Sequence, residues 1–108
     1  MSPAERAIGL RQLLESGRLL PGGIHAYYDG QGWPATLTEQ GQIVIDGRSH
    51  SSLSAAGETV KIASRGPDLP RSVLATDGWL FWRAQDQVIG DVVTLKEIRR
   101  RQAAQLLS

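Results

Sequence analysis

Three serines surround a leucine in the segment Ser51-Ser52-Leu53-Ser54, directly before a run of apolar residues with helical spacing. Serine hydroxyls at a helix start can cap the first turn, and the free backbone N–H groups there can hold a phosphate. Arg48 and His50 lie just upstream and can add positive charge or hydrogen bonds to such a site. The alternative is that Ser52 simply caps the helix while the other hydroxyls face solvent. Ser51, Ser52 and Ser54 are therefore candidate phosphate contacts, together with Arg48 and His50.

A second cluster is aromatic, with three large rings within four residues after an Asp-Gly pair: Trp79, Phe81 and Trp82. Aromatic rings can stack on a modified or extruded base. A tight turn followed by alternating large residues predicts a central strand over residues 79–84. Alternation in a strand places Trp79 and Phe81 on one face, which we expect to be core, and Trp82 on the other. Trp82 is thus the better candidate for an exposed pocket wall, and Trp79 is the second.

Basic residues are concentrated in the second half of the chain. Residues 1–60 hold four arginines against six acids, whereas residues 61–108 hold eight basic residues against five acids. Lys61, Arg65 and Arg71 follow the second predicted helix into a long loop, where basic side chains can track phosphates. On the last predicted helix, Lys96, Arg99 and Arg100 share one face, while Leu95, Ile98 and Leu106 are expected to face the core. A solvated helix face explains that second basic group as well as DNA does.

Enzymatic functions find little support in the sequence. The chain has no cysteine, two well-separated histidines, and no signature of paired carboxylates or of an activated nucleophile. Gly30-Gln31-Gly32 lacks the third glycine and the following helix of a dinucleotide-binding motif. We therefore expect a protein that is not an enzyme and that uses no cofactor and no metal.

Length and composition indicate one folded domain over residues 1–108. Hydrophobic residues make up 41% of the chain and charged residues 21%, and the net charge is +1. These proportions are typical of globular domains, and the length is sufficient for one core without staples. No stretch resembles a signal peptide or a membrane span, so we expect no membrane association and a cytoplasmic location.

Capping signals predict about three helices. Ser2-Pro3-Ala4-Glu5 is a capping box that opens a helix over about residues 3–16, closed by Gly17. Ser52 is the expected N-cap of a second helix, and Thr94-Leu95-Lys96-Glu97 opens a final one. Residues 64–76 contain Gly66, Pro67 and Pro70 and read as a long irregular loop.

Turn signals predict short strands joined as hairpins. Three strands are expected over residues 24–28, 33–38 and 42–45, and Asp46-Gly47 predicts a tight turn with residues 48–50 as the return arm. Pro34 suggests that the second of these strands starts at an edge or a bulge. A terminal hairpin is expected from residues 79–84 and 88–93. The predicted fold class is α+β, a small mainly antiparallel sheet of short strands with about three helices around it.

These motifs, taken in order, resemble the restriction enzyme adenine methylase associated (RAMA) domain, a family also described as modified-DNA readers of restriction systems. The matching segments span roughly residues 8–101: Leu13-Leu14-Glu15-Ser16-Gly17-Arg18-Leu19-Leu20-Pro21-Gly22, Asp46-Gly47, Ser51-Ser52-Leu53-Ser54-Ala55-Ala56, Asp77-Gly78-Trp79-Leu80-Phe81-Trp82 and Thr94-Leu95-Lys96-Glu97-Ile98-Arg99. Leu53 stands where the family often has proline, Gly57 where a third alanine is usual, and Asp77 where asparagine is typical. The loop over residues 64–76 is also longer than usual.

The resemblance implies a non-enzymatic protein that binds double-stranded DNA carrying modified bases, with methyladenine and methylcytosine both open. The expected DNA-binding residues are Arg48, His50, Ser51, Ser52, Ser54, Lys61, Arg65 and Arg71, with Trp82 and Trp79 as a possible base pocket. The family's association with adenine methyltransferases and nucleases implies a second possibility from a different class. The chain would then be a protein-interaction module that docks on a DNA methyltransferase or a restriction nuclease.

Overall fold

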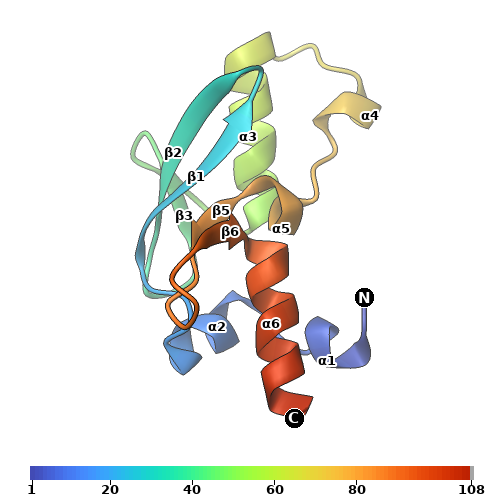
Figure 1. The fold of residues 1–108 in the computed structure, drawn as a ribbon. Coiled ribbons are helices and arrows are strands. Elements are labelled where there is room, and N and C mark those ends of the chain that lie inside the picture. The colour runs from blue at the N-terminus through green and yellow to red at the C-terminus, as the bar shows by residue number, and fades with distance from the viewer. Residues whose placement is uncertain (108) are drawn as a thin grey trace.

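The computed structural model describes residues 1–107 and shows the α+β fold that the sequence predicts (Figure 1). Three helices of seven or more residues are accompanied by three single-turn helices in this part of the chain. The helices are α1 (Pro3–Arg6), α2 (Leu10–Ser16), α3 (Leu53–Arg65), α4 (Arg71–Leu74), α5 (Gly78–Phe81) and α6 (Leu95–Leu107). The strands are β1 (Gly22–Tyr28), β2 (Gln31–Leu37), β3 (Ile43–Ile45), β4 (Arg48–His50), β5 (Arg83–Gln85) and β6 (Val92–Thr94).

The six strands form one antiparallel sheet in the order β4-β3-β2-β1-β5-β6. Two tight turns build its main hairpins. Asp29-Gly30 joins β1 to β2 and Asp46-Gly47 joins β3 to β4, and all four residues have positive φ, as type I′ turns require. β3 pairs with β2 only at Thr36 and Leu37, so Pro34 lies where that side of β2 is an edge, as predicted.

One hydrophobic core joins the sheet to the helices. Figure 1 shows α3 lying along the β1–β2 hairpin, with α6 running from the end of β6 past α1. The core is built mainly from small and branched side chains of the inner sheet face and of α2, α3 and α6, together with the Trp82 ring that follows α5. Its fully or almost fully buried members include Leu13, Leu19, Ile24, Ala26, Leu37, Ile43, Ala56, Val60, Trp82, Leu95 and Ile98. Among residues 1–107, none of the helices is long and apolar enough to cross a membrane.

The predicted N-terminal helix is divided in two. α1 ends at Arg6 and α2 starts at Leu10, with Gly9 extended between them as the N-cap of α2. The Gly9 N–H donates to Gln12 Oε1 at 2.9 Å, which closes the new helix start. Ile8 is buried with 4% of its surface exposed. Glycine is a poor helix former, which favours a break in the helix at Gly9.

The strand predicted over residues 79–84 is wrong over residues 79–82. Residues 78–81 form the helical turn α5, and the strand β5 begins at Arg83. Asp77 caps that helix, with its Oδ1 accepting the Trp79 N–H at 3.1 Å. An Asp-Gly pair can open a helix as readily as a hairpin turn, because aspartate is a favoured N-cap. Gly78 decides the outcome here, since a Cβ at this position would overlap the backbone of Leu53 and Ser54.

Three further predictions need correction at their boundaries or faces. The loop over residues 64–76 includes the short helix α4, and the predicted strand 88–93 is reduced to β6, after a loop closed by the bond from the Asp86 N–H to the Asp91 carbonyl. The cap of α6 is confirmed, because the Glu97 N–H donates to Thr94 Oγ1 at 3.2 Å. Its faces differ from the prediction, since Arg99 is buried and Leu106 is 66% exposed.

Candidate functional site

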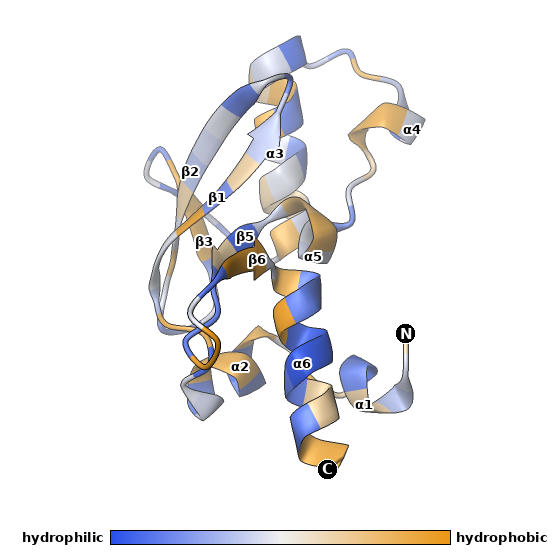
Figure 2. Cartoon of the chain, viewed as in Figure 1, coloured by the Kyte–Doolittle hydropathy of each residue, from blue (hydrophilic) through white to orange (hydrophobic). Residues whose placement is uncertain are grey.

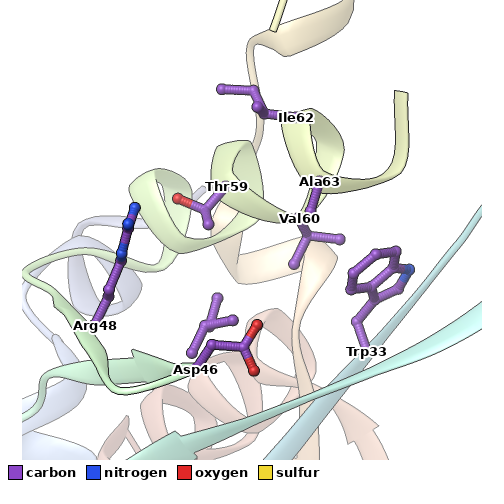
Figure 3. Close-up of a pocket in the computed structure, with 8 residues that line it drawn as sticks. Trp33, Asp46, Arg48, Thr59, Val60, Ile62 and Ala63 are labelled. Atoms are coloured by element: carbon purple, nitrogen blue, oxygen red, sulfur yellow. The ribbon is translucent and has the colours of Figure 1, made fainter. Parts of the chain in front are cut away.

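The segment from β4 to the first turn of α3 carries most of the predicted DNA contacts, and two pockets adjoin it. The first, here called the hairpin pocket, has a volume of about 420 Å³ and lies between α3, β2 and the β3–β4 hairpin (Figure 3). Its lining residues are Trp33, Ile45, Asp46, Arg48, Thr59, Val60, Ile62 and Ala63. The second, here called the serine pocket, has a volume of about 290 Å³ and lies at the start of α3.

One side of the hairpin pocket is aromatic and apolar. Figure 3 shows the Trp33 indole beside Val60, with Ala63 and Ile62 on the same helix. Trp33 is held in place because its Nε1–H donates to the carbonyl oxygen of Tyr28 at 3.3 Å. Val60 is fully buried, whereas Ile62 keeps 38% of its surface exposed. The pocket therefore offers a fixed ring and an apolar wall to a flat or apolar ligand.

Two charged residues face the hairpin pocket from the tight turn. Asp46 and Arg48 flank Gly47, and the positive φ of Asp46, 49°, belongs to that turn. In Figure 3 the Asp46 carboxylate is directed toward Trp33, and Arg48 extends along the opposite side near Thr59. Neither side chain forms a hydrogen bond or an ion pair with any residue that the structure describes. A carboxylate acceptor and a guanidinium donor are thus both available to a ligand.

His50 is turned inward and supports the pocket. Its Nδ1 lies 3.1 Å from the carbonyl oxygen of Ile43 and its Nε2 lies 2.8 Å from Thr59 Oγ1. Because a carbonyl can only accept, Nδ1 carries a proton, while the single hydroxyl proton of Thr59 is shared between His50 Nε2 and the Ala55 carbonyl oxygen, which lies 3.3 Å from Thr59 Oγ1. His50 therefore links β4 to the helix residue that lines the pocket, and it was predicted as a DNA contact without that role.

The serines at the start of α3 divide between structural bonds and free hydroxyls. Ser52 is the N-cap, with its Oγ accepting the Ala55 N–H at 3.1 Å, so the capping interpretation is confirmed. Ser54 Oγ accepts the Gly78 N–H at 3.2 Å and joins α3 to α5. Ser51 is exposed and makes no such bond within residues 1–107. Arg11, from α2, lines the same serine pocket and was missed by the sequence reasoning.

The two tryptophans predicted as a base pocket have different environments. Trp82 is fully buried, and the prediction that it is exposed is wrong, because it belongs to the turn after α5 and not to a strand. Trp79 is half-buried and lines the serine pocket. The guanidinium carbon of Arg99 lies 3.9 Å from the centre of the Trp79 ring. Burial lowers the pKa of Arg99, while the charges of Glu5 and Asp77 oppose that shift.

The three other predicted basic contacts, Lys61 and Arg65 in the second half of α3 and Arg71 on α4, do not line the hairpin pocket. Lys61 Nζ donates to the carbonyl oxygens of Val73 at 2.8 Å and Ala75 at 3.0 Å, which fastens the loop around α4. Arg65 pairs with Asp29 at 2.6 Å. The hydrogen bonds from Arg65 and Ser64 hold the pKa of Asp29 at about 2. Arg71 is exposed on α4 and has no partner among the described residues.

The sequence reasoning did not identify the hairpin pocket as a unit. The sequence places Trp33 only within the strand predicted over residues 33–38, and Asp46 only in a tight turn. The Asp46-Gly47 turn placed next to Arg48 was the available signal, because it fixes both charged side chains on one short hairpin. Among residues 1–107, no group of three or more histidine, cysteine, aspartate or glutamate side chains is arranged to hold a metal.

Comparison with known proteins gives one assignment. The family model described as Restriction Enzyme Adenine Methylase Associated (RAMA) matches residues 1–106, which is almost the whole chain. No curated protein sequence matches the chain. The match agrees with the resemblance carried by the motifs around Asp46-Gly47, the start of α3 and α5. The chain belongs to the restriction enzyme adenine methylase associated family, a group of domains associated with the adenine methylases of restriction enzymes.

Proposed function

We propose that this protein is a non-enzymatic, cytoplasmic DNA-binding module that prefers duplex DNA carrying a methylated or otherwise modified base. The observation that carries the proposal is the hairpin pocket, where the free guanidinium of Arg48 stands beside an apolar cavity of about 420 Å³. A cavity of this size is typical of sites for small planar or apolar groups. The family is associated with adenine methylases, and these enzymes produce the methylated DNA that such a pocket would recognise.

Contacts with the DNA backbone are assigned to polar groups around the start of α3. The Ser52 oxygen caps the helix, but its hydroxyl hydrogen remains available to donate. Arg48 supplies a charge, Ser51 and Ser52 supply hydroxyls, and Arg11 adds a second guanidinium from α2. Phosphate contacts of this kind position a protein on the duplex without reading sequence. His50 and Ser54 belong to the same surface, but their bonds within the protein give them a supporting role.

The other predicted cations contribute less to this surface. Lys61 and Arg65 are already bonded within the protein, so using them on DNA would first require breaking those bonds. Arg71 remains free on α4 and is kept as an outlying backbone contact. With a net charge of +1, we expect modest affinity that falls steeply as salt rises.

The free energy of burying one methyl group sets the expected ratio of affinities for modified and plain DNA. Burying one methyl group stabilises a complex by about 0.8 kcal/mol, and by roughly 1–3 kcal/mol in a tight pocket. These free energies correspond to a preference of about 4- to 150-fold over plain DNA. A reader of this kind therefore binds both duplexes, and the phosphate contacts set the baseline.

A matched pair of alanine variants tests the assignment of Arg48. Arg48→Ala should weaken binding to modified and plain duplexes alike and reduce the slope of log K against log salt by about one. Lys96 is an exposed cation on α6, and its side chain has no partner among the described residues. Lys96→Ala should therefore leave DNA binding near the wild-type value. Fluorescence anisotropy at several salt concentrations measures both. Equal effects of the two substitutions would contradict the proposed surface.

A second function, docking on a DNA methyltransferase or a restriction nuclease, is favoured by a separate observation. Arg18 is buried and connects the β5–β6 loop to the end of α6. Its side chain bonds Asp86 and Gln105, and its carbonyl oxygen accepts the Gln87 N–H. Exposed apolar side chains lie within a few residues of these groups along the chain. They are Leu20, Val88, Ile89, Leu106 and Leu107, here called the apolar end, and hydrophobic residues at the tip of the β5–β6 loop and at the end of α6 are visible in Figure 2.

Two variants separate the functions. If the chain docks on a methyltransferase, Val88→Ser combined with Ile89→Ser should abolish co-purification with that enzyme, while Arg48→Glu leaves it intact. If the chain is a DNA reader, Arg48→Glu should abolish DNA binding, and the loop variant should bind DNA normally. The loop residues are exposed, so both substitutions are expected to leave the fold stable.

A further inference from the structure

The hairpin pocket has the composition of a slot for one flat ring. Its volume of about 420 Å³ is enough for a single nucleobase and far too small for a base pair with its backbone. The Trp33 indole forms part of one wall, and Val60, Ala63 and Ile62 of α3 line the pocket with it. A base stacks on an aromatic face whatever its identity, so this wall binds a base without choosing among bases.

The slot is held in shape before any ligand arrives. The bond from Trp33 Nε1 to the Tyr28 carbonyl fixes the ring, and the bond between His50 and Thr59 ties the hairpin to α3. The β3–β4 pairing, Ile45 with Arg48 next to the turn, fixes the backbone on which Asp46 stands. A ligand that enters this site therefore meets side chains that need little rearrangement.

Asp46 supplies the directional contact. Its carboxylate can only accept hydrogen bonds at neutral pH, it is directed toward Trp33, and no described residue donates to it. Amino groups on the edges of adenine and cytosine are the matching donors, and carboxylates accept from such groups in other complexes with DNA. A methyl group on that base would contact the apolar side chains, while Arg48 is free to hold a neighbouring phosphate.

A base inside an intact duplex cannot reach such a recessed wall, because its faces are covered by the adjacent base pairs. We propose that the hairpin pocket binds one extruded amino-bearing nucleobase, stacked on Trp33 and hydrogen-bonded to Asp46. This inference rests on the proposed function and adds to it how the modified base is recognised, which is outside the base stack. Extrusion is easiest where pairing is weakest, so affinity should depend on what stands opposite the modified base.

Two probes test extrusion on duplexes that contain N6-methyladenine or 5-methylcytosine. The first is the affinity ratio between a duplex with the modified base opposite an abasic site and the same duplex fully paired. We expect the unpaired form to bind at least 10-fold tighter to the wild-type protein. The second is 2-aminopurine next to the modified base, whose fluorescence should rise on binding as its neighbour leaves the stack. A flat signal and equal affinities, with the preference for modified DNA intact, would overturn extrusion and leave the proposed function standing.

The variants assign the effect to the pocket. Trp33→Ala should remove the abasic-site advantage, and Trp33→Phe should restore a large part of it, because phenylalanine also offers a ring face. Asp46→Asn should reduce the advantage several-fold. Asp68→Asn is the matched control, since Asp68 is an exposed acid in the loop after α3 with no described partner, and it should have no effect. An advantage that persists in both Trp33→Ala and Asp46→Asn would overturn the assignment.

A measurement without duplex DNA separates the two proposals. Free N6-methyldeoxyadenosine or 5-methyldeoxycytidine at millimolar concentration should shift the NMR signal of the Trp33 indole N–H and leave that of buried Trp82 unchanged. If the nucleosides bind this way and no duplex binds, the proposed function fails while the ligand class of the pocket stands. If neither nucleoside nor duplex perturbs Trp33, the pocket assignment is wrong.

Discussion

The indole N–H of Trp82 donates a hydrogen bond of 2.9 Å to the carbonyl oxygen of Leu53, the first residue of α3. Trp82 is fully buried, and Phe81 packs edge-on against it with ring centres 5.4 Å apart. The aromatic cluster therefore positions the start of α3 from inside the core. Ser51 and Arg48, which we propose contact DNA, lie on the chain segment directly before this contact.

Trp82→Phe tests that relationship. The substitution removes the donor to Leu53 and leaves a small gap in the core, so it should destabilise the fold by about 1–3 kcal/mol. Urea unfolding followed by circular dichroism measures the free energy of unfolding. Tyr27→Phe removes a polar group from a ring that is 67% exposed and should change the stability by less than about 0.5 kcal/mol. An unchanged free energy of unfolding in Trp82→Phe would show that the buried hydrogen bond to Leu53 contributes little.

Gly78→Ala tests the close contact between α5 and α3. A Cβ at this position would overlap the backbone of Leu53 and Ser54, which cannot move without disturbing the start of α3. We expect a loss of about 1–3 kcal/mol in the free energy of unfolding. Gly23→Ala is the matched control, because a Cβ there meets nothing within 4 Å and the backbone has no positive φ. Comparable losses in the two variants would contradict the close-contact explanation.

Asp86 predicts a loss of stability in acid. It is fully buried, and burial alone would raise its pKa, but the hydrogen bonds from Arg18 and Arg101 and from two backbone N–H groups outweigh burial and hold the pKa at about 2. A lowered pKa in the folded state means that this stabilisation is complete above about pH 4 and is lost as the pH falls toward 2. Unfolding free energies measured between pH 7 and pH 2 should decline across that window.

Asp86→Asn isolates this residue from the other carboxylates. At pH 7 the substitution leaves the buried guanidinium of Arg18 without its charge partner and should destabilise the fold by about 3–5 kcal/mol. The variant should also lose less stability than the wild type between pH 4 and pH 2, because one of the titrating groups is gone. Parallel pH profiles for the two proteins would show that Asp86 does not drive the acid transition.

The Asp29–Arg65 pair gives a prediction that does not depend on stability. The hydrogen bonds from Arg65 and Ser64 hold the pKa of Asp29 at about 2 in the wild type. Arg65→Ala should move that pKa back toward its ordinary value near 3.8, as measured by carbon-detected NMR titration of the Asp29 carboxylate. Ser64→Ala, the matched control, removes the weaker influence and should move it less. An unchanged pKa in Arg65→Ala would mean that the pair does not persist in solution.

The parts of the fold that were predicted correctly depend on contacts between near neighbours in the chain. The Asp46-Gly47 hairpin, the Ser52 cap and the Thr94 cap each follow from a few adjacent residues. The α5 turn was missed because Asp77-Gly78 fits two local structures, and a contact with Leu53, far away in sequence, selects between them. Gly57 shows the same dependence, since a Cβ there would lie 2.6 Å from the side chain of Thr76.

The candidate site was harder to predict for the same reason. The sequence indicated Arg48 and the serines, because they lie together at one helix start. It could not show that Trp33 of β2, Asp46 of the turn and Val60 of α3 would line one pocket. It also could not show that Lys61 donates to the carbonyls of Val73 and Ala75, which are 12 and 14 residues away. Nor could it show that Arg65 pairs with Asp29, which is 36 residues away.

The most direct test of the proposed function is a fluorescence-anisotropy titration of the wild-type protein with three duplexes of one sequence, at two salt concentrations. The duplexes carry N6-methyladenine, 5-methylcytosine or no modification. The proposal predicts that one modified duplex binds about 4- to 150-fold tighter than the plain one, and that all affinities fall as salt rises. Equal binding of the three duplexes, or none at low salt, would contradict it.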